Sequence, residues 1–369
     1  MENKHIRSLL TGCVMLLWAG LSLFAWLKTP EGSSDTERRT LAQRPDPSFE
    51  NFLSGDFMTQ FEEYTTDQFP FRQRFRQLKA EFHYNVLSQK DNNGIYLVDG
   101  VAARLEYPLN DASLDHAVSV FEGVYNRYLE GTECRIYQAV VPDKGCYLAS
   151  ENGYPAMDYT ALLERVERGL PWAVRIDLTD CLAAEDYYRT DTHWRQERLL
   201  NAAQRLCEAM DAPLPQPNGY TQTPLDVPFY GVYYGQAAIP MEPETIYLME
   251  SDILSACTVY NFETRKTTSV YDLNQRSSRD LYDVYLSGAA ALLQIHNPNA
   301  AAHRELVVFR DSFGSSMVPL LVQGYETITL VDLRYIQSSI LDQFIQFENQ
   351  DVLFLYSTLV LNDSNALKR

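Results

Sequence analysis

A serine and an aspartate follow a short apolar run in the last fifth of the chain. Residues 306–309 are all apolar, as expected for a strand covered on both faces, and Asp311 and Ser312 come directly after them. An apolar segment with helical spacing follows at 315–323, which places Ser312 between a strand end and a helix start. Backbone N–H groups at such a helix start can stabilise an oxyanion. Ser312 is therefore a candidate nucleophile, and the alternative is that Asp311 and Ser312 only cap the helix.

Asp191 and His193 lie two residues apart in the segment 187–194, between a predicted strand at 174–178 and a predicted helix at 196–210. In an extended loop, side chains two residues apart point the same way. Nucleophilic acyl chemistry needs a base beside the hydroxyl and a carboxylate that fixes the tautomer of the imidazole. The pair therefore predicts a Ser–His–Asp triad with Ser312, and the alternative is a capping aspartate beside a surface histidine.

Strands and helices alternate through most of the chain, which predicts a parallel sheet with helices on both faces. Both candidate loops would then lie at the carboxyl edge of one sheet. The section from about 213 to 300 is rich in Tyr, Gly and Thr and predicts loops and antiparallel hairpins inserted into the sheet domain. Strands are expected at 134–141, 174–178, 306–309, 327–332 and 351–356, and helices at 114–129, 159–170, 196–210, 315–323 and 338–348.

The N-terminus predicts a membrane anchor. Lys4 and Arg7 precede a run without charge at residues 9–27, which is long enough for a spanning helix. The basic flank lies on the N-terminal side, so the positive-inside rule puts the N-terminus in the cytoplasm and the rest of the chain outside it. No small-x-small cleavage site ends the apolar run, which favours an uncleaved anchor over a signal peptide. The predicted location is the cell membrane, with a single pass.

The predicted organisation is a cytoplasmic tip with the anchor at 1–28, a tether at 29–50 and an extracytoplasmic domain at 51–369. That domain would begin with a helical part at 51–112. A formal net charge of −18 and a pI near 4.7 argue against nucleic acid as a partner. Five of the six cysteines lie beyond the anchor without paired short spacing, so neither a disulfide framework nor a zinc site is indicated, although Cys134 and Cys146 could pair.

The candidate loop also resembles a known family. Its run Thr190-Asp191-Thr192-His193-Trp194 is similar to the signature of the DHHW family, relatives of the alginate acetylation proteins AlgX and AlgJ in the SGNH-hydrolase superfamily. Further blocks resemble the family in the same order between about residues 35 and 360. They are Glu37-Arg38-Arg39-Thr40-Leu41-Ala42, Asp67-Gln68-Phe69-Pro70-Phe71-Arg72, Asn93-Gly94-Ile95-Tyr96, Val141-Pro142-Asp143-Lys144, Arg310-Asp311-Ser312-Phe313-Gly314 and Val331-Asp332-Leu333-Arg334.

The resemblance implies a flavodoxin-like three-layer α/β/α sandwich with Ser312 as nucleophile, His193 as base and Asp191 as the orienting acid. It also implies a role in O-acetylation of a cell-surface or secreted polysaccharide, with a membrane-bound O-acyltransferase as acyl donor and no cofactor. Thr192 stands where the family name has a second histidine, but the Asp-x-His spacing is kept. Ala289 stands where a side-chain donor to the oxyanion is expected, which leaves only the backbone N–H of Gly288.

Four further residues are candidates for contacts with the substrate or the oxyanion: Gly288, Lys144, Trp194 and Asp311. Lys144 could contact an anionic ligand or pair with a carboxylate. Trp194 and the tyrosines near 230–235 could stack on sugar rings or pack in the core.

The sequence thus predicts an anchored O-acetyltransferase or acetylesterase that works through an acyl-serine, and it does not choose between transfer and hydrolysis. A catalytically weak accessory protein that binds the glycan or the acyltransferase is the alternative, favoured by Ala289. A metal-dependent phosphoesterase using Asp191, His193 and Asp311 is disfavoured because no further His/Asp cluster accompanies them, so no metal is predicted.

Overall fold

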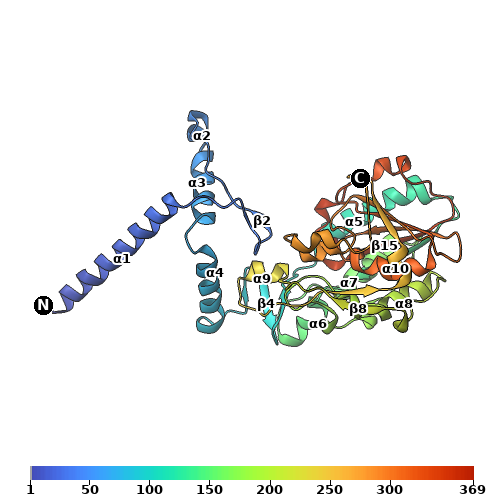
Figure 1. The fold of residues 1–369 in the computed structure, drawn as a ribbon, viewed down its shortest axis with the longest axis horizontal. Helices are drawn as coiled ribbons and strands as arrows, with labels where there is room; N and C mark the ends of the chain where they lie inside the picture. Colours follow the sequence, from blue (N-terminus) through green and yellow to red (C-terminus); the bar gives the residue numbers. More distant parts are fainter. Residues whose placement is uncertain (1) are drawn as a thin grey trace. The chain divides into compact units, whose positions relative to one another are not determined.

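The computed structural model describes residues 2–369, with side chains from residue 5 onward. Met1 and the side chain of Lys4, both part of the predicted cytoplasmic tip, lie outside the described part. The chain divides into two compact units, residues 1–92 with 235–240, and residues 93–234 with 241–369 (Figure 1). The domain boundaries expected from the sequence differ from this division and stay a prediction.

The first unit is mainly helical. Its elements are α1 Glu2–Leu27, β1 Ser33–Ser34, β2 Arg39–Thr40, α2 Phe49–Ser54, α3 Asp56–Asp67, α4 Arg72–Glu81 with a π-helical turn at Phe82–Val86, and β3 Asp91–Asn92. Within α1, the segment His5–Leu27 is long and apolar enough to cross a membrane. The side chain of Ser48 caps α2 by accepting from the backbone N–H of Asn51, and Gly55, with φ +86°, separates α2 from α3.

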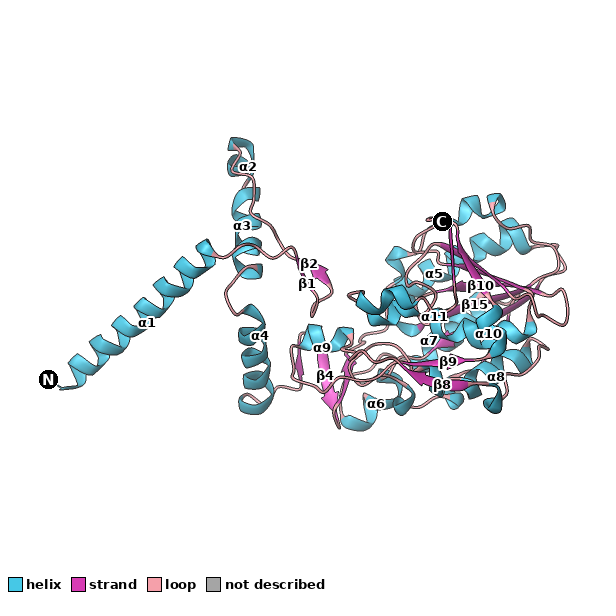
Figure 2. Ribbon diagram, in the orientation of Figure 1, coloured by secondary structure: helices cyan, strands magenta, loops and turns pink. Residues whose placement is uncertain are grey.

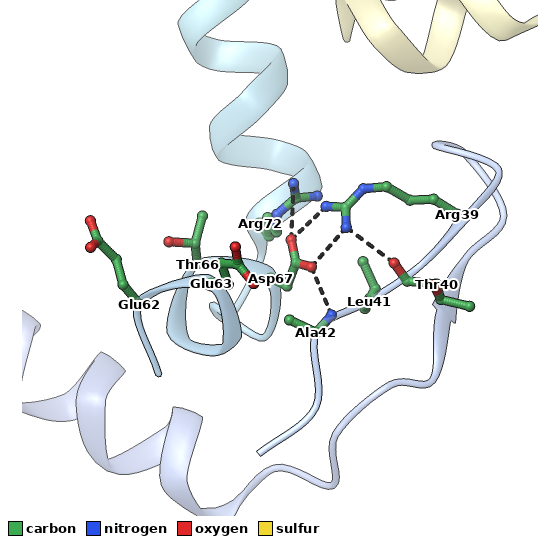
Figure 3. Close-up of a pocket in the computed structure, with 9 residues that line it drawn as sticks. All are labelled: Arg39, Thr40, Leu41, Ala42, Glu62, Glu63, Thr66, Asp67 and Arg72. Carbon is green, nitrogen blue, oxygen red and sulfur yellow. Dashed lines mark hydrogen bonds and ion pairs between the residues drawn. The ribbon is translucent and has the colours of Figure 1, made fainter. Parts of the chain in front are cut away.

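Two of the blocks that resemble the DHHW family meet in this unit (Figure 3). Arg39 Nη1 donates to Asp67 Oδ2 at 2.7 Å, and the same oxygen accepts from the backbone N–H of Ala42 at 2.8 Å. Arg72 pairs with Glu37 and lies 3.5 Å from Asp67 Oδ1. The hydrogen bond from Arg39 lowers the pKa of Asp67 to about 2. The acids and arginines of the two blocks therefore tie the segment before α2 to the α3–α4 turn.

The second unit is built around an eight-stranded sheet, which contains β10 and β15 of Figure 2. Its strand order is β11-β10-β12-β14-β13-β15-β6-β7. The five strands from β14 to β7 are parallel, and β12, β10 and β11 extend the β14 edge in antiparallel pairing. The strands are β6 Arg135–Val141, β7 Val174–Ile176, β10 Thr258–Asn261, β11 Lys266–Thr268, β12 Leu292–His296, β13 Glu305–Arg310, β14 Thr327–Val331 and β15 Asp351–Ser357.

Helices cover both faces of this sheet. Alternate residues of β13 point to opposite sides: Val308 packs with α8 (Leu200–Ala209), whereas Val307 and Phe309 pack in the cluster that holds α5 (Asp111–Val124) and α7 (Tyr159–Gly169). The predicted SGNH-like three-layer α/β/α fold is confirmed. The unit also holds hairpins β4 Ile95–Val98 with β5 Val101–Arg104 and β8 Thr221–Pro224 with β9 Tyr247–Glu250, and short helices α6 Gly145–Leu148, α10 Asp252–Ala256, α11 Gly314–Met317 and α12 Thr358–Asn362. The short helix α9 Val232–Ala237 begins in this unit, and its residues from 235 onward belong to the first.

Some predicted elements differ from the structure. The section at 213–300 contributes β10, β11 and β12 to the main sheet, because the apolar residues of β12 pair with β14. The helix expected at 315–323 is α11 followed by a 3₁₀ segment, Val318–Gly324; Pro319 has no N–H to continue an α-helix. The helix expected at 338–348 is a 3₁₀ segment, Ser338–Gln343. All six cysteines are free, so Cys134 and Cys146 do not pair.

Candidate active site

Asp191, His193 and Ser312 lie together at the carboxyl edge of the parallel strands. His193 Nδ1 is 2.6 Å from Asp191 Oδ1, and His193 Nε2 is 2.8 Å from Ser312 Oγ. An ionised carboxylate only accepts, so Nδ1 carries the proton and Nε2 is free to accept from the serine hydroxyl. Asp191 and His193 are buried, whereas Ser312 is half-buried and can be reached from solvent. This geometry allows His193 Nε2 to take a proton from the hydroxyl of Ser312, which is what a serine nucleophile needs.

The carboxylate of Asp191 is fixed from two sides. Its Oδ1 also accepts from the backbone N–H of His193 at 3.0 Å, and its Oδ2 accepts from the backbone N–H of Val232 at 2.7 Å. Gly231 permits this approach, because a Cβ at that position would lie 2.2 Å from the carbonyl oxygen of Thr190. The segment 231–232, which comes from the long irregular section, therefore sets the orientation of the acid.

Glu244 holds the residue before the acid. Its two carboxylate oxygens accept from the backbone N–H groups of Arg189 and Thr190, each at 2.8 Å, and the hydroxyl of Thr190 donates to the same carboxylate at 2.8 Å. The backbone N–H groups of Tyr233 and Tyr234 donate in turn to the carbonyl of Thr190. These bonds hold the backbone of the loop at the two residues before Asp191.

Aromatic rings hold the imidazole of His193. The ring of Tyr282 stacks on it, with 4.0 Å between ring centroids and 11° between planes. The ring of Phe313 is tilted relative to the imidazole, with 5.0 Å between the two centroids. The hydroxyl of Tyr282 is 2.7 Å from Ser316 Oγ, which also accepts from Nε1 of Trp194 at 2.9 Å. Tyr282 is nearly completely buried, and burial raises its pKa well above the usual value. It therefore acts as a neutral ring that fixes the plane of the base.

Asp311 has a structural role. It is fully buried, and its carboxylate accepts from the backbone N–H groups of Phe313 at 3.0 Å and Ser357 at 2.8 Å. These bonds join the turn after β13 to the end of β15, which fixes the strand end that presents Ser312. The predicted contact of Asp311 with substrate or oxyanion is corrected, because its oxygens are committed to the backbone.

Trp194 and Lys144 are also buried. For Trp194, the structure shows the second of the two predicted alternatives, packing in the core, and a contact of Lys144 with an anionic ligand stays a prediction. Trp194 is fully buried and packs edge-on against Phe313 at 5.4 Å, so it offers no face to a sugar ring. Lys144 Nζ donates to the carbonyl of Tyr188 at 2.8 Å and to that of Ala102, and burial lowers its pKa to about 7. Lys144 ties the loop that carries the triad acid and base to the β5 segment.

The expected oxyanion donor, Gly288, is not available in this conformation. Its backbone N–H donates to the carbonyl of Tyr285 at 3.2 Å, and it lies at φ +80°, where a Cβ would lie 2.3 Å from Asp283 Oδ1. Gly288 is thus required by its turn, which corrects its predicted role. Among the described residues, the backbone N–H of Ser312 makes no hydrogen bond, so it is one donor that an oxyanion formed at Ser312 could use.

Sequence reasoning missed Gly231, Val232, Glu244 and Tyr282. All four come from the irregular section at about 213–300, and they reach the triad through contacts distant in sequence. The density of tyrosines there was the available signal. Of those near 230–235, Tyr233 is buried and Tyr230 is exposed, so stacking of Tyr230 on a sugar stays a prediction.

The second unit is thus a three-layer α/β/α fold in which Asp191, His193 and Ser312 lie within hydrogen-bonding distance of one another in series. A family model described as DHHW protein matches residues 177–331, which contain Asp191, His193 and Ser312. The resemblance to the DHHW family is thereby confirmed. No curated protein matches the sequence.

Two of the solved structures that this chain matches, with TM-scores above 0.5, have a similar fold. A DHHW family protein from Eubacterium siraeum matches with a TM-score of 0.62 at 22% identity, over 75% of this chain and 94% of that chain. Bacillus cereus PatB1 with a sulfonyl adduct matches with a TM-score of 0.55 at 17% identity, over 72% of this chain and 95% of that chain. The O-acetyltransferase domain of Pseudomonas putida AlgJ has a TM-score of 0.43 at 15% identity, over 73% and 92% of the two chains.

Proposed function

We propose that this protein is a membrane-anchored, extracytoplasmic O-acetyltransferase or acetylesterase that acts on a polysaccharide through an acyl-Ser312 intermediate. The observation that carries the proposal is the continuous set of contacts from Asp191 through His193 to Ser312, at 2.6 and 2.8 Å. The family resemblance supports the choice of acetyl groups and of a polysaccharide.

The chemistry follows from the tautomer that Asp191 imposes. Ser312 Oγ attacks the acetyl carbonyl carbon while its proton passes to Nε2 of His193, and the carbonyl oxygen becomes an oxyanion next to the backbone N–H of Ser312. When the oxyanion collapses, the bond to the leaving oxygen breaks, and that oxygen takes the proton from Nε2. A sugar hydroxyl or water then attacks acetyl-Ser312, gives its proton to Nε2, and releases the serine as that proton returns to Oγ.

The cellular arrangement is proposed from α1 and its basic flank. With α1 crossing the membrane and its N-terminus in the cytoplasm, the second unit lies outside, where a polysaccharide is the substrate. A membrane-bound O-acyltransferase is the proposed acyl donor. The test of location is protease treatment of intact cells, which should degrade the second unit and leave a short N-terminal fragment.

The test of the chemistry is labelling of the full chain in detergent micelles with a fluorophosphonate, and acetyl release from 4-nitrophenyl acetate. A sulfonyl fluoride is included because Bacillus cereus PatB1 has been solved with a sulfonyl adduct. Ser312→Ala and His193→Ala should both lose labelling and turnover, whereas Ser150→Ala, at an exposed serine, should keep them. Addition of acetyl acceptors such as xylo- or manno-oligosaccharides then separates transfer from hydrolysis.

A second candidate is an accessory protein that binds the glycan or the acyltransferase with little catalysis. The observation that favours it is that the backbone N–H of Gly288 donates to the carbonyl of Tyr285 and so does not serve an oxyanion. Loss of one oxyanion donor costs about 2.7–4 kcal/mol of transition-state stabilisation. Absence of fluorophosphonate labelling in a folded wild-type protein would favour this candidate over the enzyme.

A further inference from the structure

An apolar stripe runs along α4 and the π-helical turn that continues it. Its members are four, three, four and four residues apart and therefore lie on one face. All of them are exposed, with 63% of Phe71, 60% of Leu78 and 64% of Val86 accessible. The stripe consists of Phe71, Phe75, Leu78, Phe82 and Val86. A contiguous apolar surface of this kind marks a site of interaction.

The opposite face of α4 contacts other parts of the first unit. Ala80 is completely buried, and Arg76 Nη2 donates to the backbone carbonyl of Gly235 at 2.8 Å. Arg72 pairs with Glu37 in the network described above. These contacts fix the rotation of the helix about its axis. The start of the stripe packs on aromatic residues of the same unit, as Phe75 does on Phe69 at 5.5 Å, and the rest of the stripe, from Leu78 to Val86, is exposed.

Basic side chains flank the stripe. Arg74 and Lys79 are exposed on either side of it. A helix with large apolar residues on one face and Lys or Arg beside them is typical of segments that lie in the plane of a membrane interface. Their long side chains can keep the charge among lipid headgroups while the stem covers apolar surface.

The stripe is continuous with the apolar part of α1. The ring of Phe71, its first member, stacks on Phe24 of α1 with 6.1 Å between centroids and 7° between planes. The preceding Phe69 contacts Trp18 of α1 at 6.3 Å. Phe24 lies in the last turn of α1, which ends at Leu27, so the α3–α4 turn lies beside the C-terminal half of the apolar run. The α3–α4 turn therefore contacts α1 at the same place where the stripe begins.

We propose that α4, with its apolar stripe, lies in the interface of the same bilayer that α1 crosses, and that the occupant of the stripe is lipid. The inference rests on the proposed anchoring by α1 and is independent of the proposed chemistry at Ser312. It makes α4 a second attachment to the membrane, in addition to the spanning helix.

The test uses the full chain in vesicles of phosphatidylcholine and phosphatidylglycerol, with a single NBD fluorophore on cysteine. The stripe is labelled through Leu78→Cys in a chain whose Cys13, Cys134, Cys146 and Cys181 are serine. The control label is placed by Glu164→Cys, at an exposed site on α7 in the same background. A third chain keeps Cys13, which is exposed on α1, as its only accessible cysteine and reports on the anchor.

Quenching by lipids with a nitroxide on the acyl chain gives the readout. A nitroxide placed near the headgroup should quench the label at position 78 about threefold or more as strongly as the label at position 164. The reason is that interfacial helices bury their apolar face about 5–10 Å into the boundary between headgroups and acyl chains. Quenching at Cys13 without quenching at 78 would overturn the inference and leave the anchor intact. No quenching at Cys13 would remove the anchor and the inference together.

A protein occupant gives a different result. If a second copy of this chain covers the stripe, the label at position 78 is shielded from aqueous iodide, is not quenched by nitroxide lipids, and loses its shielding when the chain is diluted into excess vesicles. That pattern would also overturn the lipid proposal. Fluorophosphonate labelling of Ser312, measured on the same samples, reports separately on the proposed chemistry.

Discussion

Replacing Gly231 by alanine tests how the acid of the triad is held. The added Cβ would lie 2.2 Å from the carbonyl oxygen and 2.3 Å from the carbonyl carbon of Thr190, and 2.4 Å from the Cα of Asp191. All three are backbone atoms, so no side chain can turn aside. The two segments must separate by about 1 Å to restore ordinary contact, and the bond from the Val232 N–H to Asp191 Oδ2 is then lost.

The expected loss in kcat is about 100-fold. A hydrogen bond to a charged group contributes about 1.5–3 kcal/mol, which corresponds to between about 10- and 150-fold. A displacement of about 1 Å in a catalytic arrangement has a similar effect. KM should change much less, because Gly231 acts through Asp191. Both constants are measured by acetyl release from 4-nitrophenyl acetate, with circular dichroism as the check of folding.

Two comparisons make the result interpretable. Gly219→Ala, in the same section, meets nothing within 4 Å and should keep wild-type kcat. Val232→Pro removes the N–H that donates to Asp191, at the first position of α9, where proline is tolerated, and should lower kcat by about 10-fold or more. A folded Gly231→Ala protein with wild-type kcat would refute the argument that the 231–232 segment orients the acid.

Three further outcomes are expected. Tyr282→Leu removes the ring that stacks on His193 and should lower kcat between about two- and twelvefold, because an aromatic pair contributes about 0.5–1.5 kcal/mol. Tyr282→Phe keeps the ring and should keep most of the activity. Equal losses of kcat for the two variants in steady-state assays would contradict this. The pKa of Lys144 is about 7 in the folded chain against about 10.4 in the unfolded chain, so in this range the unfolded chain holds one more proton and stability rises with pH. In urea unfolding, the stability of the wild type relative to Lys144→Met should thus rise by about 1.4 kcal/mol per pH unit from about pH 7 to 10, and a flat difference would refute the shift. Lys144→Met should also lower kcat, since Tyr188 loses its donor, and Lys144→Arg should not restore it at a fully buried site.

The sequence predicted the parts of the site that depend on local pattern. The apolar run before Asp311 identified a buried strand, and the Asp-x-His spacing placed Asp191 and His193 in one loop. Parallel pairing then brings both loops to one edge, as the geometry at Ser312 shows. These inferences need only the periodicity of strands and the direction of the chain.

The surroundings of the triad could not be predicted in the same way. Tyr282 and Glu244 reach the loop from distant positions in an irregular section, and no local spacing indicates such contacts. Trp194 is of a residue type that often stacks on sugars, but here it is buried in the core. Its burial depends on the whole fold, which a local pattern does not show. The sequence predicted a helical part at 51–112, but a local pattern cannot show that the apolar face of α4 is exposed.

The central claim is that Ser312 carries the acetyl group, and acid-quenched mass spectrometry tests it most directly. The full chain is mixed with 4-nitrophenyl acetate, quenched within the first turnover and digested. The account predicts one acetyl group on the peptide that contains Ser312, absent in His193→Ala and discharged when an acceptor glycan is added before the quench. Turnover without acetyl on that peptide, or acetyl that persists unchanged in His193→Ala, would contradict it.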